Sequence, residues 1–342
     1  DDWVYDFSEK NLISKITFFI KNYNYFIKIN DNSWNNCIKW SRDLKNKFNN
    51  KVKINFNKNL ITLSNYRPFI KKYWYYENVL TDRFTKNHLS MFGVNLNQEN
   101  TVICINIGNK EFNLLSSKYL VDLHFNGDSQ CLPLYIYDKD GNRHDNITDW
   151  ALNQFKNYYE NPEYRLKSVL QKIDIFHYVY AVLHNPIYRE KYELNLKREF
   201  PRIPFYNNFF QWADWGKQLM DLHLNYETIE KYPLKRIDLE SAKIPKAKLK
   251  ADKENNLIIL DDNTTLSDIP AIAWDYKLGN RSALEWILDQ YKEKTPKDKT
   301  IAEQFNNYRF ADYKEAVIDL LMRVTTVSIE TMKIIEMMRQ ID

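Results

Sequence analysis

A run of cationic and aromatic side chains between Tyr66 and His88 is the part of the sequence best suited to binding a polyanion. Six residues of this run carry the hypothesis: Tyr66, Arg67, Lys71, Lys72, Arg83 and Lys86. Cations can neutralise phosphates, arginine can pair with both acceptors on the major-groove edge of guanine, and tyrosine hydroxyls can contact phosphates or sugars. The same alternation is also typical of a strand pair with a buried aromatic face and a solvated basic face. The residues alone do not decide between these two interpretations.

A second basic group follows the helix start expected at Pro186. Its members are Arg189, Lys197, Arg198 and Arg202. Arg189 and Lys197 are eight residues apart, so on one helix they would lie close to the same face. Three glutamates in the same stretch partly neutralise the charge. Because this stretch also belongs to the longest of the ordered phrases described below, we interpret the group mainly as scaffold, with some phosphate contact.

Two Asn-Pro sequences, starting at Asn161 and Asn185, have the outline of the loop with which amino-methyltransferases hold their target amino group. In both, the second proline of that loop is replaced. Both lie between expected helices, where Asn-Pro is a common junction, rather than after a strand. No glycine-rich cofactor loop precedes them, and the chain has only six glycines. We do not expect methyl transfer by this chain.

Signals for a nuclease, for ATP and for zinc are also missing from the sequence. Asp275 and Asp312 each begin an Asp-Tyr-Lys triplet, but neither has an acidic partner on a nearby strand with which to share a metal ion. The sequence has no GxxxxGK[ST] loop. Cys37, Cys104 and Cys131 lack the spacing of metal ligands and are expected to be reduced thiols. We expect no catalytic residue, metal or cofactor in this chain.

The composition sets broad limits on the chain. It has 342 residues, a net charge of +4 and a pI of about 8.6, so the overall charge does not indicate nucleic acid by itself. Hydrophobic residues make up 44%, enough for a substantial core, but no apolar run approaches the ~20 residues of a membrane-spanning helix. The sequence opens on Asp1 without a signal peptide. It also lacks an initiator Met, which fits a fragment or a processed chain. We expect a cytoplasmic monomer.

The elements that would position these residues follow from hydrophobic periodicity. Residues 9–47 have the pattern of two helices, residues 51–137 contain short β-branched and aromatic runs, and helical patterns return from residue 146. These patterns predict an α+β fold with N-terminal helices, a mixed or antiparallel sheet and then a helix-rich C-terminal lobe. On the expected strand 119–125, Asp122 and His124 would point to the same face and could share a ligand.

The second half of the chain has clearer local signals. Thr148 is a good N-cap for a helix that begins directly after it. A β-hairpin is expected around Asn255–Asn256, and further helices are expected over 279–292 and 312–339. The chain can be divided into sub-lobes 1–145, a helical lead plus sheet, and 146–342, helix-rich with a short hairpin, although no Gly/Ser/Pro-rich spacer marks that boundary.

Longer phrases run through nearly the whole chain in one order. They are DDWVYDFS (1–8), YRPFIKKYWYYE (66–77), CLPLYIY (131–137), NITDWAL (146–152), the long block from DIFHYVYAVLHNPIYREKYEL to QLMDLHLNYE (174–227), IPAIAWDYKLGNRSALEW (269–286) and DLLMRVTTVSIETMKII (319–335). In this order they resemble the C-terminal specificity region of type ISP restriction–modification enzymes. Those single-chain enzymes recognise, methylate and cut DNA.

The resemblance implies that residues 1–342 form a target-recognition domain that reads a short asymmetric site in double-stranded DNA. It also implies a longer bacterial parent protein, in which upstream domains supply the nuclease, an ATP-driven motor and a methyltransferase that modifies adenine at N6. S-adenosylmethionine, ATP and Mg²⁺ would be bound by those domains. Double-stranded DNA and the upstream methyltransferase and motor domains would be the partners of this chain.

A protein-interaction scaffold is the alternative. In that case the helical lobe would dock the methyltransferase or motor domains and would read little DNA itself. A large exposed apolar surface on that lobe would favour this role, because soluble monomers rarely expose such surfaces.

Overall fold

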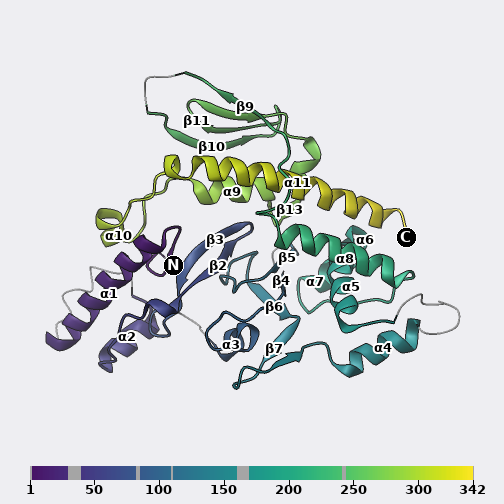
Figure 1. The fold of residues 1–342 in the computed structure, drawn as a ribbon, viewed down its shortest axis with the longest axis horizontal. Helices are drawn as coiled ribbons and strands as arrows, with labels where there is room; N and C mark the ends of the chain where they lie inside the picture. The colour runs from purple at the N-terminus through teal and green to yellow at the C-terminus, as the bar shows by residue number, and fades with distance from the viewer. Residues whose placement is uncertain are drawn as a thin grey trace.

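The computed structural model describes residues 2–29, 40–81, 85–108, 111–159, 169–240 and 244–341. Over these ranges helices surround several small sheets, and the predicted α+β fold class is confirmed (Figure 1). Three sequence features considered above lie outside the described residues: Arg83, Cys37 and the Asn-Pro sequence that starts at Asn161.

An N-terminal lobe of two helices lies at the left of Figure 1. Its helices are α1 (Glu9–Ile29) and α2 (Arg42–Asn49). Apolar residues of α1 recur every three or four positions, from Leu12 to Ile27, and they are buried on one face. The Ser41 hydroxyl accepts a hydrogen bond from the Leu44 amide at 3.1 Å and so caps the start of α2.

The strands of the first half are antiparallel, but in the described ranges they form three small sheets rather than the single sheet expected. The first sheet has the order β1-β3-β2, with bounds Tyr5–Asp6, Ile70–Tyr75 and Ile61–Arg67. The second has the order β5-β4-β6, with bounds Leu114–Ser117, Val102–Asn106 and Ser129–Pro133. The third is the hairpin of β7 (Tyr135–Tyr137) and β8 (Arg143–Asp145). A short helix, α3 (Lys86–Phe92), connects the first two sheets along the chain.

The strand expected over residues 119–125 is wrong, because this segment turns instead. The Asp122 carboxylate accepts a hydrogen bond from the His124 amide at 2.9 Å, which is the local geometry of an Asx turn. The Phe125 amide then donates to the Asp122 carbonyl. Asp122 and His124 therefore do not share the face of a strand, although both side chains line the cleft described below.

A helical lobe follows on the right of Figure 1. Its helices are α4 (Asp149–Tyr159), α5 (Lys172–His184), α6 (Pro186–Lys191), α7 (Glu193–Leu196) and α8 (Phe209–Leu224). The Ala151 amide donates to the Thr148 hydroxyl at 3.2 Å, so the predicted cap of α4 is confirmed. α5 and α8 pack backbone to backbone at Gly216, where a Cβ atom would lie 1.8 Å from the His177 carbonyl oxygen.

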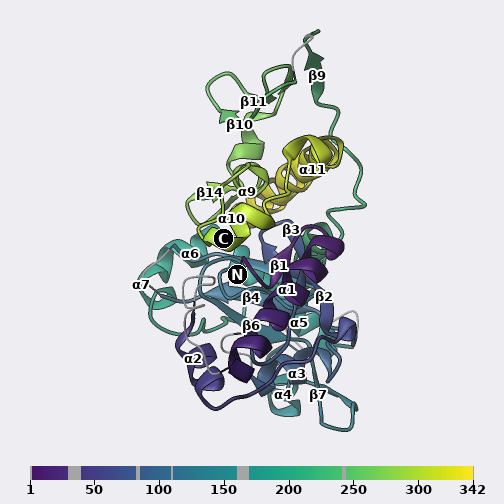
Figure 2. The same cartoon turned by 90° about the vertical axis from the view of Figure 1, so that its left-hand side faces the viewer.

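A four-stranded antiparallel sheet projects at the top of the molecule, above α11, in both ribbon views (Figures 1 and 2). Its order is β10-β11-β12-β9, with bounds Ala247–Asp252, Leu257–Asp261, Thr264–Ser267 and Lys235–Asp238. The predicted hairpin is confirmed, and Asn256 at its turn has the left-handed φ of +54° that asparagine tolerates. The sheet stands on α9 (Ala283–Tyr291) and α11 (Lys314–Arg339), which confirm the two predicted C-terminal helices.

Shorter elements complete the described chain. They are η2 (Lys58–Leu60), η3 (Ala271–Trp274), β13 (Lys277–Leu278), β14 (Arg281–Ser282), α10 (Lys299–Gln304) and η4 (Phe310–Asp312). In the described ranges, no helix is both long enough and apolar enough to cross a membrane.

The hydrophobic clusters run across residue 145. One cluster combines Ile103 and Ile105 of β4 with Phe176 of α5, and another combines Trp74 of β3 with Val324 of α11. The Trp3 indole also donates to the Asp298 carboxylate at 2.9 Å, which joins the N-terminal segment to the start of α10 (Lys299–Gln304). The division into sub-lobes 1–145 and 146–342 stays a prediction, and these clusters show extensive contact between its two parts.

Candidate functional site

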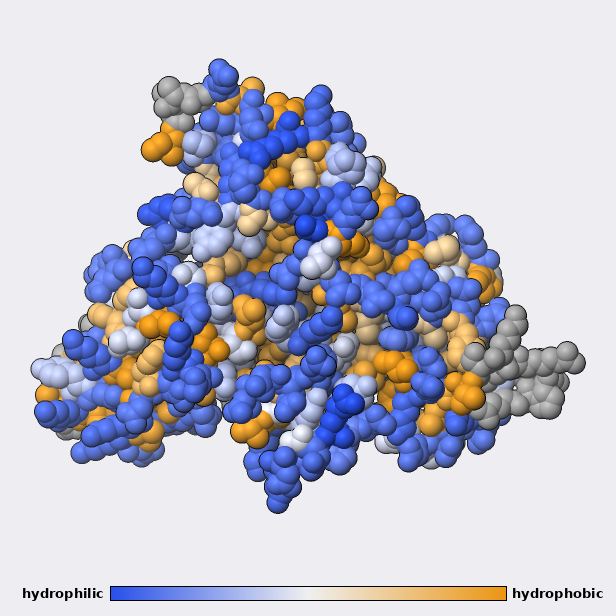
Figure 3. Space-filling model, in the orientation of Figure 1, coloured by the Kyte–Doolittle hydropathy of each residue, from blue (hydrophilic) through white to orange (hydrophobic). Residues whose placement is uncertain are grey.

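A cleft of about 970 Å³ lies between the start of α2, helix α3 and the turn that follows β5. Aromatic residues including Trp3 and Trp74 line it, and so do polar side chains from α3 and from the turn: His88, Asp122, His124, Asp128 and Gln130. Figure 3 shows that the face of the molecule in Figure 1 is mainly hydrophilic, with small separate hydrophobic patches over both lateral lobes. The cleft combines polar groups with rigid walls, and we take it as the candidate site.

The turn between Asp122 and Ser129 is held from behind by buried hydrogen bonds. The guanidinium of Arg67, on β2, forms an ion pair with the Asp122 carboxylate at 2.6 Å. The Asn126 amide group donates to the Cys104 carbonyl at 2.9 Å and accepts from the Ser129 hydroxyl at 2.6 Å. These contacts fix the backbone of the turn and leave His124 and Asp128 exposed at its tip.

The cations predicted on β2 and β3 are mostly engaged inside the molecule. Only 14% of the Arg67 side chain is exposed, because it is paired with Asp122. The Lys71 ammonium lies 2.5 Å from the Glu227 carboxylate and 4.6 Å from the centre of the Tyr119 ring. The structure therefore gives each of these side chains an intramolecular partner.

Lys72 has an unusual position among the predicted residues. Its ammonium group lies over two aromatic rings, 3.9 Å from the centre of Tyr66 and 4.7 Å from that of Phe7. Burial, together with the neighbouring charges of Arg67 and Lys15, lowers the pKa of Lys72 to about 8. Burial also raises the pKa of the Tyr66 hydroxyl. Both residues are partly exposed and belong to a cluster of aromatic and charged side chains.

Lys86 is exposed as the first residue of α3, next to the cleft wall that His88 and Met91 form. No ion pair of Lys86 is found among the described residues. Burial lowers the pKa of His88, and its Nδ1 atom accepts a hydrogen bond from the Thr85 amide at 3.0 Å. Of the first predicted group, Lys86 is the residue best placed to meet a ligand at the cleft.

The second predicted group belongs to the helical lobe, and no contact joins it to the first group in the described part of the chain. Arg189 points inward, where its Nε donates to the Leu183 carbonyl at 2.6 Å. Lys197 pairs with Glu193, and Arg202 pairs with Glu199 at 3.2 Å. Arg198 and Arg202 are exposed. The structure does not bring the two predicted groups together into one site.

Sequence reasoning missed a third basic segment, which forms the α2 side of the cleft. It includes Arg42, Lys45, Lys51 and Lys53, all of them exposed. The signal was present in the sequence: residues 40–58 contain six cations and one acid, Asp43. Aromatic interleaving drew attention to the Tyr66–His88 run instead.

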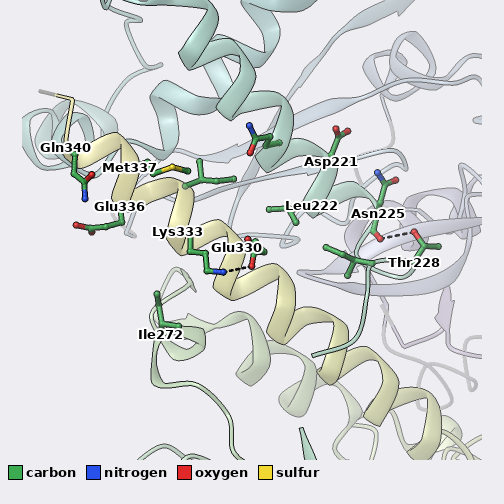
Figure 4. Close-up of a pocket in the computed structure, with 13 residues that line it drawn as sticks. Asp221, Leu222, Asn225, Thr228, Ile272, Glu330, Lys333, Glu336, Met337 and Gln340 are labelled. Carbon is green, nitrogen blue, oxygen red and sulfur yellow. Dashed lines mark hydrogen bonds and ion pairs between the residues drawn. The ribbon is translucent and has the colours of Figure 1, made fainter. Parts of the chain in front are cut away.

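A second hollow, an apolar groove of about 820 Å³, lies between α8 and α11 (Figure 4). Its apolar lining is Leu222, Ile229, Ile272, Ile334 and Met337. Asp221, Glu330 and Glu336 also line it, and Lys333 pairs with Glu330 at 2.8 Å. This groove is the kind of exposed apolar surface that the scaffold alternative requires.

The histidines of the helical lobe lie in the core rather than at a site. The His223 ring forms hydrogen bonds with the Tyr180 hydroxyl at 2.6 Å and with the Thr331 hydroxyl at 3.0 Å. Burial lowers the pKa of His223 to about 3. His184 is also buried, and its pKa is lowered by the same cause. Among the described residues, no three His, Cys, Asp or Glu side chains are grouped so as to hold a metal ion.

Comparison with known proteins identifies the family. The profile described as the type ISP C-terminal specificity domain matches residues 1–320. None of the curated proteins compared matches the chain. Among solved structures, the chain is similar to the cryoEM structure of the DrdV–DNA complex, with 44% identity and a TM-score of 0.92.

Two further solved structures are similar along the whole chain. One is a nuclease-deletion mutant of the type ISP enzyme LlaGI in complex with a DNA substrate mimic (32% identity, TM-score 0.81), and the other is the ATP-dependent type ISP enzyme LlaBIII bound to DNA (29% identity, TM-score 0.83). All three matches cover 98% of this chain but only 34%, 26% and 22% of the DrdV, LlaGI and LlaBIII chains. With its match to the profile over 320 residues and its 44% identity to DrdV, this chain belongs to the family of type ISP C-terminal specificity domains.

Proposed function

We propose that this chain recognises a short sequence in double-stranded DNA, as the specificity module of a type ISP restriction–modification enzyme. One observation carries the proposal: 98% of the chain matches structures that were determined with DNA or a DNA mimic bound. The chain spans about a third or less of those proteins. Adenine methylation, ATP use and DNA cleavage would therefore belong to the rest of the parent protein, together with any S-adenosylmethionine and Mg²⁺.

The cleft supports a mechanism in which the 122–129 turn and α3 read base edges. Gln130 can form two hydrogen bonds with adenine, and Asp128 can accept from the amino group of cytosine. Because the Nδ1 atom of His88 accepts from the Thr85 amide, a neutral His88 carries its proton on Nε2, which can act as a donor. The cleft is too small for a duplex, whereas a turn or a helix fits a major groove about 12 Å wide. We therefore propose that the rim of the cleft enters the groove.

Phosphate contacts would then fix the register of the protein on DNA. Of the predicted residues, Lys86, Arg198 and Arg202 have the exposure for such contacts. Arg67 would act from behind by holding Asp122, so that the reading turn is ordered before DNA binds. This order lowers the entropy that must be lost on binding.

Selection from a randomised duplex library at two salt concentrations tests the proposal. We expect one short asymmetric site to be enriched, and substitution of Asp128 and Gln130 by alanine to reduce enrichment at particular positions of that site. Each lost base contact should cost about 1–3 kcal/mol of discrimination. Binding without enrichment of any site would contradict sequence recognition by this chain alone.

The groove between α8 and α11 favours a second candidate role, the docking of a methyltransferase or motor domain. Ile272 and Met337 are its most exposed apolar residues, at 37% and 42%. The substitutions Ile272→Glu and Met337→Glu should weaken association with separately produced upstream domains without changing the DNA site that is selected. Unchanged association would remove this candidate.

A further inference from the structure

The positive charge of the chain is concentrated at its N-terminal end. The first 60 residues contain 11 cationic and 6 acidic side chains, whereas the other 282 contain 38 and 39. The excess arises from residues 42–58, which we call the basic arm. Since the remainder of the chain is close to neutral, the field that a polyanion would meet is strongest here.

The basic arm is ordered by contacts with the core. The Asn24 side chain, from α1, donates to the Ile54 carbonyl at 2.7 Å and accepts from the Ile54 amide at 3.1 Å. The Asn57 amide donates to the Tyr75 hydroxyl at 3.2 Å, and the Phe56 ring stacks on that of Tyr75 with centroids 5.9 Å apart. The arm is therefore a fixed feature of the surface.

The anchoring side chains and the cationic side chains of the arm point in different directions. In α2, Leu44 is buried, whereas Arg42 and Lys45 are exposed. After the helix, Ile54 is buried with 2% exposure, and Lys51 and Lys53 before it are exposed. The core contacts thus leave these four cations exposed, and they form a row along the sequence.

The cations of this row have no acidic partner. Arg42, Lys45, Lys51 and Lys53 form no ion pair with any described residue, unlike Lys197, Arg202 and Lys333, each of which lies beside a glutamate. Unpaired surface lysines are common. Four exposed cations with one acid among their neighbours are a more specific arrangement. Each phosphate that they neutralise would release condensed counterions, so binding of DNA here would depend on salt.

The start of the arm is also one wall of the candidate cleft. Leu44 of the arm and Ser41 just before it line the cleft, and Arg42 and Lys45 are their neighbours in the sequence. We propose that the basic arm binds the phosphodiester backbone of duplex DNA beside the recognition site, and that it supplies salt-dependent affinity without reading bases. The inference rests on the proposed function and assigns the sequence-independent part of the affinity for DNA to one segment.

A charge-neutralised variant tests this inference in the 342-residue chain. The variant carries Arg42→Gln, Lys45→Gln, Lys51→Gln and Lys53→Gln. Its matched control carries Lys217→Gln, Lys246→Gln, Lys250→Gln and Lys277→Gln, four exposed lysines elsewhere with no ion pair in the described ranges. Thermal unfolding establishes that both variants fold, and Kd is measured against salt concentration for the selected duplex and for an unrelated one.

We expect the log–log salt slope to fall by about 3 to 4 in the arm variant and to change much less in the control, since each phosphate contact adds ~0.9 to the slope. The ratio of Kd values for the two duplexes should stay within about twofold of wild type. Equal slopes for the arm variant and wild type, or equal losses in both variants, would overturn the arm proposal while the proposed function stands. A lost preference for the selected duplex would overturn the assignment to the backbone alone, and a wild-type chain that binds no duplex would overturn the proposed function itself.

Discussion

Two basic regions of this domain use their charge in opposite ways. On β2 and β3, Arg67 pairs with Asp122, Lys71 pairs with Glu227, and Lys72 lies over aromatic rings. In the basic arm, by contrast, the structural contacts come mainly from apolar residues and backbone groups. Lys58 pairs with Glu9 and Lys47 donates to the Asn78 carbonyl, but the other four cations of the arm are exposed and form no ion pair with a described residue. A cation that alternates with aromatic residues in a strand pair can thus be held by contacts inside the protein. An exposed cation in an asparagine-rich segment such as the arm can instead contact a ligand.

The largest effect should come from Arg67, because its removal leaves a buried carboxylate without a partner. We expect Arg67→Met to lower the free energy of unfolding by about 3 kcal/mol, as measured by urea denaturation. Arg67→Met combined with Asp122→Asn should recover part of that loss. A change below about 0.5 kcal/mol in the single variant would place Arg67 among the surface cations.

The contribution of Lys72 to the free energy of unfolding should depend on pH. Its pKa of about 8 in the folded chain is below that of an unfolded lysine, so between about pH 8 and 10.5 the unfolded state binds more protons. The Lys72 contribution to stability therefore rises with pH in this window, by at most about 1.4 kcal/mol per unit. Wild type should gain stability relative to Lys72→Met between pH 7.5 and 9.5. A Lys72 difference that stays flat over this pH range would mean that this ammonium is solvated.

A smaller effect is expected at Lys71, where the partner Glu227 is half exposed. Solvent screens such a pair, so Lys71→Gln should cost less than about 1 kcal/mol in urea unfolding. The cost should shrink further in 1 M salt. If Lys71→Gln lowered the free energy of unfolding as much as Arg67→Met, the contribution of a cation on these strands would not depend on its burial.

The smallest effect on stability should come from the arm. Lys53→Gln should change the free energy of unfolding by less than about 0.5 kcal/mol, because the side chain is exposed. It should nevertheless lower the salt slope of DNA binding by about 1. Stability and salt slope measured on the same variant separate the two regions. If Arg67 makes no phosphate contact, Arg67→Met should lower the free energy of unfolding and leave the salt slope unchanged.

Local signals were sufficient for much of the fold but not for the site. The cap at Thr148, the hairpin turn at Asn255–Asn256 and the helix over Lys314–Arg339 depend on neighbouring residues, and each was predicted. The division of the strands into small sheets was not. It depends on which strands pair, and a local pattern does not contain that information.

The same limit explains the site. Arg67 and Asp122 are 55 residues apart, and Lys71 and Glu227 are 156 residues apart, so no local window shows that these cations are already paired. The turn at Asp122 had the alternation of a strand, and the hydrogen bonds that fold it involve residues on β2 and β4. The basic arm, in contrast, could have been found by counting charges along the sequence.

The projecting sheet has a consequence for how this protein behaves when concentrated. β9 pairs only with β12, so in the described chain its other edge presents backbone donors and acceptors without a strand beside them. Ile237 and Leu239 are exposed there, but charged residues also occupy the strand: Lys235, Arg236 and Asp238. Charges on an edge strand oppose pairing with the same edge of another copy. The charged side chains of β9 should therefore oppose association of two copies of the protein through this edge.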